Sequence, residues 1–135
     1  MILLLDTNVC IDLMRKSHSP VSDAFLAAIA AGHDLVISSI TTFELELGVL
    51  RAGNKAKDVG ALADFRRAPG HIVNFDTDCA KSAATLCDCA LSQGRQLSAY
   101  DGLIAGHALS RGATLVTSDA RLAAAVTEFG VVNWR

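Results

Sequence analysis

Aromatic residues and long apolar runs are scarce in this sequence. Only 5% of its 135 residues are aromatic although 51% are hydrophobic, with alanine and leucine the most abundant apolar types. This composition favours tightly packed helices on a sheet over a β-sandwich. The longest apolar stretch, residues 24–32, is much shorter than the roughly 20 residues that a membrane-spanning helix needs. We therefore expect no membrane association.

Metal-binding cysteine pairs and a secretory signal are absent as well. No C-x2-C spacing that would begin a zinc site occurs among the four cysteines, which are Cys10, Cys79, Cys87 and Cys89. The first residues carry no basic segment and Asp6 interrupts the first apolar run, which argues against a signal peptide. We interpret the cysteines as reduced structural thiols and expect a cytoplasmic protein.

The net charge is small too. A formal charge of −2 gives no overall attraction to nucleic acid. Its distribution is uneven, because residues 51–67 contain five basic and only two acidic side chains. Such a segment is either a solvated helical face or a surface that contacts phosphate, and the sequence leaves both interpretations open.

What the sequence does contain begins at its N-terminus. Four large apolar residues, Ile2–Leu5, stop at Asp6 and two small polar residues. A continuous apolar run of this length predicts a strand buried on both faces, as in a parallel sheet covered by helices on each side. Asp6 then lies at the C-terminal end of the strand, where ligands bind in open α/β sheets.

The rest of the chain alternates strands with one or two helices. Further strands are predicted at residues 35–37, 71–75, 114–117 and 131–133, and helices at about residues 8–15, 20–32, 43–53, 54–69, 77–94, 101–112 and 120–126. This order predicts an α/β fold in which one parallel sheet of about four to five strands carries helices on both faces. We expect a single domain spanning residues 1–135.

Several details of the helices are also predicted. The spacing of Phe43, Leu47 and Leu50 indicates an inward-facing stripe on the third helix. Asn54 is expected to cap the fourth helix, which ends at the break Pro69-Gly70. Gly106 lies inside a later helix, where a glycine costs about 1 kcal/mol relative to alanine. We expect it to loosen the local packing.

Four of the fourteen carboxylates stand where this architecture gathers side chains at one end of the sheet, after a strand or in the first turns of a helix. They are Asp6, Glu44, Asp101 and Asp119. Carboxylates brought this close together repel one another and raise each other's pKa unless a cation neutralises them. Oxygen ligands without cysteine or histidine suit Mg²⁺ or Mn²⁺. Such sites activate water and stabilise displacement at phosphorus.

Each of these acids also has a structural interpretation. Asp6 can accept hydrogen bonds in a strand-to-helix turn, and Asp101 and Asp119 can act as caps or first-turn acids. Glu44 follows Thr41 by three residues, which fits a capping box. Taken together, four structural acids at one end of a sheet are less plausible than a metal site.

Five short motifs follow one another along nearly the whole chain, at residues 3–8 (LLLDTN), 39–45 (SITTFEL), 100–105 (YDGLIA), 115–119 (LVTSD) and 131–134 (VVNW). In their order and spacing the chain resembles PIN-domain nucleases, specifically the VapC-type toxins of bacterial type II toxin–antitoxin pairs. The resemblance implies a three-layer PIN-like fold. It further implies RNA cleavage, a homodimer, and inhibition by a small antitoxin whose tail lies in the active-site groove.

The resemblance also implies roles for individual residues. The four acids would form a metal pocket for Mg²⁺ or Mn²⁺ that is both catalytic and metal-binding, with Asp6 and Asp101 as the most direct ligands. Thr7 and Thr117 would supply supporting hydroxyl groups.

Other functions fit the sequence less well. A phosphoacceptor receiver domain would need a lysine after its last strand, and no lysine follows residue 81. A haloacid-dehalogenase phosphatase would need an aspartate where Asn8 stands. The remaining alternative is a catalytically inactive PIN-fold module that binds metal or RNA, which four retained acids disfavour.

Overall fold

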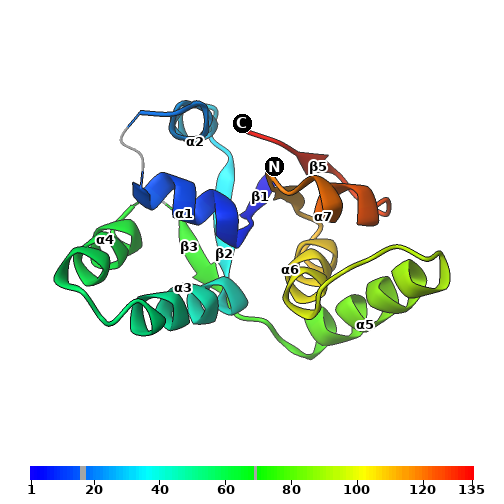
Figure 1. The fold of residues 1–135 in the computed structure, drawn as a ribbon. Helices are drawn as coiled ribbons and strands as arrows, with labels where there is room; N and C mark the ends of the chain where they lie inside the picture. The colour runs from blue at the N-terminus through cyan, green and yellow to red at the C-terminus, as the bar shows by residue number, and fades with distance from the viewer. Residues whose placement is uncertain (16–17, 69) are drawn as a thin grey trace.

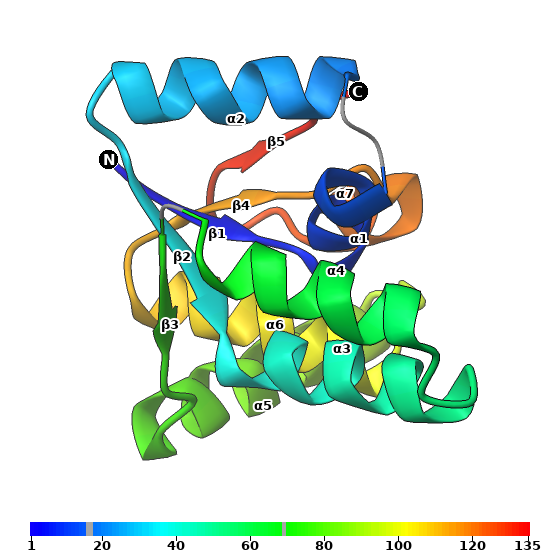
Figure 2. The same cartoon turned by 90° about the vertical axis from the view of Figure 1, so that its left-hand side faces the viewer.

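The computed structural model describes residues 1–15, 18–68 and 70–135. Within these ranges a parallel sheet of five strands lies between two layers of helices (Figures 1 and 2). The strand order is β3-β2-β1-β4-β5. The strands are β1 (Ile2–Leu5), β2 (Asp34–Ser38), β3 (His71–Val73), β4 (Thr114–Val116) and β5 (Val131–Val132). The predicted three-layer α/β fold is confirmed.

The helices fall into two groups, one on each side of the sheet (Figure 1). The first group comprises α1 (Thr7–Arg15), α2 (Pro20–Ala30), α3 (Ser39–Arg51) and α4 (Ala56–Arg66). The second comprises α5 (Thr77–Ser92), α6 (Ala99–Ser110) and α7 (Ala120–Ala125), with α5 packed along α6. Within the described ranges, the helices are too short or too polar to cross a bilayer.

Alternate residues of the central strands supply the two hydrophobic cores between these layers. In β1, Leu3 and Leu5 pack with the first helix group, whereas Leu4 packs with the second. The neighbouring strand β4 does the same with Val116 and Leu115. The apolar run that begins the sequence is therefore a strand buried on both faces, as predicted.

The order of the strands also determines which side chains meet at the sheet's C-terminal edge. Strand β1 has β2 on one side and β4 on the other, so the chain order reverses there. Leu5 pairs with Val116, and the amide of Asp6 donates to the carbonyl of Val116 at 2.9 Å. The first residues beyond the two strands, Asp6 and Thr117, are therefore neighbours.

The orientation predicted for α3 is wrong. Its inner side carries Thr41 and Leu45, which are buried and lie one turn apart. Phe43, Leu47 and Leu50 consequently face outward and are 47%, 41% and 64% exposed. This stripe of apolar side chains therefore stays substantially exposed to solvent within the described chain.

Two further details concern the ends of α4. The predicted cap by Asn54 is wrong, because Asn54 has a left-handed backbone (φ 56°) and Lys55 occupies the N-cap position without a side-chain hydrogen bond. Asn54 thus serves the turn between α3 and α4, a conformation that asparagine tolerates better than most residues. The predicted break at Pro69-Gly70 involves residue 69, which lies outside the described residues.

Gly106 tightens the packing of α6 where we expected loosening. A Cβ atom at this position would overlap the backbone of Ala83 in α5, so only glycine allows the two helices to approach this closely. One turn earlier in α6, a Cβ at Gly102 would overlap the sulfur of Cys87, which also lies in α5. The close helix pair holds α6, and with it Asp101, firmly against the rest of the second layer.

Replacing Gly106 by alanine should therefore destabilise the protein although alanine favours helix. We expect a loss of about 1–3 kcal/mol in the free energy of unfolding, from overpacking against Ala83. Gly60, in the interior of α4, has open space around its Cβ position. Its replacement by alanine is the matched control and should stabilise by up to about 1 kcal/mol. Urea unfolding of both variants tests this, and equal stability would contradict the packing account.

Candidate active site

Asp6 is the centre of the candidate site. It links the end of β1 to the start of α1, and its side chain is only 3% exposed. Oδ1 accepts a hydrogen bond from the amide of Thr7, and Oδ2 accepts one from the hydroxyl of Thr117, each at 2.8 Å. Both carboxylate oxygens are thus fixed in direction by groups on α1 and just beyond β4.

Glu44 reaches this centre through Thr7. The Thr7 hydroxyl donates to Oε1 of Glu44 at 2.7 Å, and its oxygen lies 3.1 Å from the hydroxyl oxygen of Thr41. Thr41 is fully buried, so the three side chains join α1 to α3 at the sheet's edge. Sequence reasoning treated Thr41 only as a helix cap and missed this role.

The capping-box interpretation of Glu44 is wrong. Helix α3 begins at Ser39, and its N-cap is Ser38, whose hydroxyl oxygen accepts from the amide of Ile40. Thr41 and Glu44 therefore lie inside the helix, on the side that faces Thr7. The carboxylate of Glu44 contacts another element instead of its own helix end.

Asp101 contributes negative charge to the same centre. It lies in the first turn of α6, where its amide donates to Oγ of the N-cap residue Ser98 at 3.2 Å. The pKa of Asp6 is raised from 3.8 to about 6. Burial is the largest cause and the charges of Asp101 and Glu44 add to it, whereas the hydrogen bonds from Thr117 and Thr7 act in the opposite direction. Three of the four predicted acids therefore interact electrostatically.

Asp119 is placed differently. Its Oδ1 accepts from the amides of Arg121 and Leu122, which makes it the N-cap of α7. Its own amide donates to the Thr117 hydroxyl oxygen at 3.0 Å, and that hydroxyl donates to Asp6. Asp119 thus adjoins the site through Thr117, with one carboxylate oxygen occupied by the helix.

The donor chemistry of this group suits a hard divalent cation. Its members are carboxylate and hydroxyl oxygens, and the uncompensated charge around Asp6 favours a cation. In the described part of the chain, no three acidic, histidine or cysteine side chains already converge as a set able to hold a metal ion. Asp101 and Glu44 would have to close on Asp6, which mutual repulsion of metal-free carboxylates opposes.

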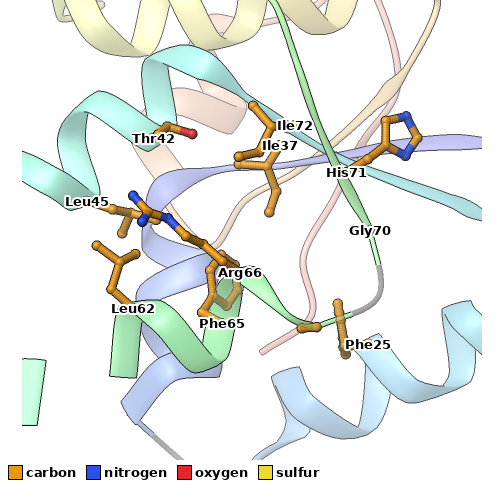
Figure 3. Close-up of a pocket in the computed structure, with 11 residues that line it drawn as sticks. Phe25, Ile37, Thr42, Leu45, Leu62, Phe65, Arg66, Gly70, His71 and Ile72 are labelled. Atoms are coloured by element: carbon orange, nitrogen blue, oxygen red, sulfur yellow. The ribbon is translucent and has the colours of Figure 1, made fainter. Parts of the chain in front are cut away.

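Two cavities lie near the first helix group. One, of about 510 Å³, is lined by α1, α3 and α4 and includes Glu44, Arg15 and Lys57. The other, of about 190 Å³, lies among α2, α3, α4 and β3, and its lining is mostly apolar (Figure 3). None of the four candidate acids lines the second cavity, so only the first adjoins the candidate site.

The raised pKa of Asp6 gives a testable pH dependence of stability. The folded state binds this proton more tightly than the unfolded state, so proton binding to Asp6 stabilises the fold fully below pH 3.8, and this contribution is lost as pH rises through about 6. Asp6→Asn lacks this contribution at every pH. In EDTA, the free energy of unfolding of Asp6→Asn should therefore rise relative to that of wild type by about 1–2 kcal/mol as pH increases from about 5 to about 7.5.

Urea unfolding at the two pH values measures this difference. Asp88→Asn, which removes an exposed carboxylate on α5, controls for the loss of one charge. If the stability of Asp6→Asn relative to wild type changed with pH no more than that of this control, the raised pKa of Asp6 would be disproved.

Comparison with known proteins agrees with the motifs and the fold. The PIN domain family matches residues 3–127. Ribonuclease VapC2 of Rickettsia felis is 30% identical over 134 residues, covering 99% of this chain and 98% of the relative. The tRNA(fMet)-specific endonuclease VapC of Shigella flexneri is 29% identical over 118 residues, covering 87% of this chain and 86% of the relative.

Solved structures show the same relationship. The crystal structure of VapBC2 from Rickettsia felis, bound to a DNA fragment from the promoter, matches with a TM-score of 0.89 and 27% identity over 100% of both chains. Since the family match, the VapC relatives and the structural match all span nearly the full chain, this protein belongs to the PIN domain family and is of the VapC toxin type.

Proposed function

We propose that this protein is a Mg²⁺- or Mn²⁺-dependent endoribonuclease, the toxin of a toxin–antitoxin pair, with residues 1–135 forming one nuclease domain. The observation that carries the proposal is the buried carboxylate of Asp6, fixed by two hydrogen bonds beside the charges of Asp101 and Glu44. The four free cysteines support a location in the reducing cytoplasm.

Each residue of the proposed site has a distinct task. Asp6 and Asp101 would hold the cation, which when bound supplies Lewis-acid stabilisation of the charge that develops on the attacked phosphate. The Thr7 and Thr117 groups keep Asp6 oriented, and the Thr7 hydroxyl also fixes Glu44. Orientation by such partners is a substantial part of how a metal site works.

Glu44 and Asp119 complete the proposed set of four acids. Glu44 adds a negative charge whose direction is set by Thr7. Asp119 has one oxygen engaged by the start of α7, so its second oxygen is the one left for the site. We therefore expect Asp119 to contribute less to metal binding than Asp6 and Asp101.

RNA is the proposed substrate class. The names of two relatives, a ribonuclease and an endonuclease specific for tRNA(fMet), support it. The basic segment at residues 51–67 supplies Lys57 to the cavity that Glu44 also lines, and Arg15 lines it from α1. These two cations are suited to contact phosphates that flank the cleaved bond.

A small antitoxin is the proposed protein partner, supported by the similarity to a VapBC structure. Its basic tail would place an arginine or lysine among the acids, where charge-assisted hydrogen bonds replace the cation. The adjoining cavity between α1, α3 and α4 is lined partly by apolar side chains, including Ile11, Met14 and Val49, and offers room for apolar residues of the same tail.

A second copy of the chain is the proposed partner of the exposed side of α3. Phe43, Leu47 and Leu50 form the uncovered stripe, and the ring of Phe43 lies 5.8 Å from that of Tyr100 on α6. Contiguous exposed apolar groups of this kind mark interaction surfaces. A homodimer joined here would have its interface close to the candidate site of each protomer, because Phe43 and Tyr100 directly precede Glu44 and Asp101.

The alternative function is that of a catalytically inactive PIN-fold module that binds metal or RNA. Cleavage of RNA distinguishes the two: the nuclease proposal predicts cleavage of cellular RNA in Mg²⁺ or Mn²⁺ and none in EDTA. Asp6→Asn and Asp101→Asn should abolish cleavage. Glu44→Gln should fold normally but cleave at least about 100-fold more slowly, a loss of roughly 2.7 kcal/mol of transition-state stabilisation.

Asp23→Asn, an exposed acid on α2, is the control variant for these cleavage assays. EDTA-resistant cleavage, or wild-type rates in the Asp6 and Asp101 variants, would contradict the metal-dependent mechanism. Metal or RNA binding without any cleavage would favour the inactive module.

The dimer proposal makes a separate prediction. Leu47→Asp places a charge in the middle of the stripe and should convert the dimer to a monomer at micromolar concentration, as measured by light scattering after size exclusion. Leu91→Asp is the matched control, because Leu91 is 71% exposed on α5 and lies outside the stripe. A wild-type monomer, or a Leu47→Asp variant that stays dimeric, would rule out this interface.

A further inference from the structure

His107 is a buried polar residue that the proposed reaction does not use. It lies in α6 with no exposed surface, and its Nδ1 is 2.8 Å from the hydroxyl oxygen of Ser38. Its other ring nitrogen, Nε2, has no hydrogen-bond partner among the described residues. A buried nitrogen without a partner lowers stability, which an apolar residue of similar size would avoid. The imidazole is therefore best explained by what Nδ1 contacts.

That contact is the cap of α3. The hydroxyl oxygen of Ser38 accepts from the amide of Ile40 at 3.1 Å and so closes the first turn of the helix. The same oxygen shares the hydrogen bond with His107, and either group can donate, according to the imidazole tautomer. His107 thus fixes the start of α3 from a different helix.

A second contact locks the same junction. Ser39, the first residue of α3, accepts from the amide of Phe75 at 3.0 Å. The ring of Phe75 packs edge-on against the imidazole of His107, with centroids 5.5 Å apart and planes at 88°. Ser38 and Ser39, at the start of α3, are therefore both connected to His107 of α6. Ser38 contacts it directly, and Ser39 does so through Phe75.

The two helices joined in this way carry the candidate acids. Glu44 lies six residues after Ser38 on α3, and Asp101 lies six residues before His107 on α6. Among the described residues, hydrogen bonds link Glu44 to the central acid Asp6 only through Thr7, whose hydroxyl donates to Glu44 and whose amide donates to Asp6. A small shift of α3 would break the bond between Thr7 and Glu44. The bond between His107 and Ser38 opposes such a shift.

We propose that His107 is a positioning residue of the nuclease site, whose hydrogen bond to Ser38 holds the Glu44 helix and the Asp101 helix at the separation that cation binding requires. This inference rests on the proposed function. His107 touches neither substrate nor cation. It acts through Ser38 and the start of α3.

The experiment compares three substitutions of one side chain. His107→Leu fills the space without a polar group, His107→Asn keeps a polar atom at the δ position near Ser38, and His107→Gln moves it to the ε position. We expect the Leu and Gln variants to bind Mn²⁺ about 10-fold or more weakly by calorimetry, and the Asn variant to recover most of the wild-type affinity. In RNA cleavage, kcat should fall while KM stays near its wild-type value.

Ser38→Ala tests the other partner and remains informative if the histidine variants do not fold. Ser19→Ala is its matched control, because Ser19 caps α2 through a 3.1 Å bond from Ser22 and lies away from the acids. Ser38→Ala should weaken Mn²⁺ binding, whereas Ser19→Ala should lower stability alone. Equal Mn²⁺ affinity in the two serine variants, or in wild type and His107→Leu, would overturn the proposal.

A crystal structure of metal-free His107→Leu separates this inference from the proposed function. The Thr7–Glu44 hydrogen bond, 2.7 Å in the wild-type structure, should lengthen beyond hydrogen-bonding distance. An unchanged bond would overturn the positioning role. A wild-type protein that neither binds Mn²⁺ nor cleaves RNA would instead refute the proposed function, while this distance would still decide whether His107 positions α3.

Discussion

The burial of one carboxylate, that of Asp6, is the constraint on which the rest of the structure depends. A carboxylate that is only 3% exposed is unfavourable to ionise, and its pKa of about 6 reflects that. The hydrogen bonds from Thr7 and Thr117 compensate in part. Both donors are in place only because β1 is paired with β4 and leads directly into α1. The order of the strands therefore determines the electrostatic environment of Asp6.

The three-layer architecture extends this centre in both directions. From the first helix layer, α3 delivers Glu44 through the Thr7 hydroxyl. From the second layer, α6 delivers the charge of Asp101, and its close packing on α5 depends on Gly106. The hydrogen bond between His107 and Ser38 joins α6 to the end of β2, where α3 begins. The helices that stabilise the sheet are thus the same ones that set the spacing of the acids.

The sequence predicted the elements better than their orientations. The place of Asp6 at the end of β1 was predictable because a strand buried on both faces has a distinctive apolar run, and here that run ends abruptly at Asp6. The local geometry of Glu44 is ambiguous in the sequence, because Ser38 lies three residues before Thr41 and both residues are good helix caps. In the structure Ser38 is the cap of α3. The outward orientation of the stripe that includes Leu47 is not predictable from the sequence, because periodicity shows that a helix has an apolar side and not which neighbour covers that side. Burial and partner contacts decide such cases, and both are tertiary properties.

The central claim is that the acids around Asp6 are a cation site and not merely a set of helix-end contacts. The most direct measurement is a crystal structure of the wild-type protein grown with Mn²⁺, in which anomalous scattering locates the ion. The account predicts an anomalous peak at coordinating distance from the carboxylates of Asp6 and Asp101, with Glu44 turned toward it. A structure with bound Mn²⁺ elsewhere and none at Asp6, at saturating Mn²⁺, would contradict it.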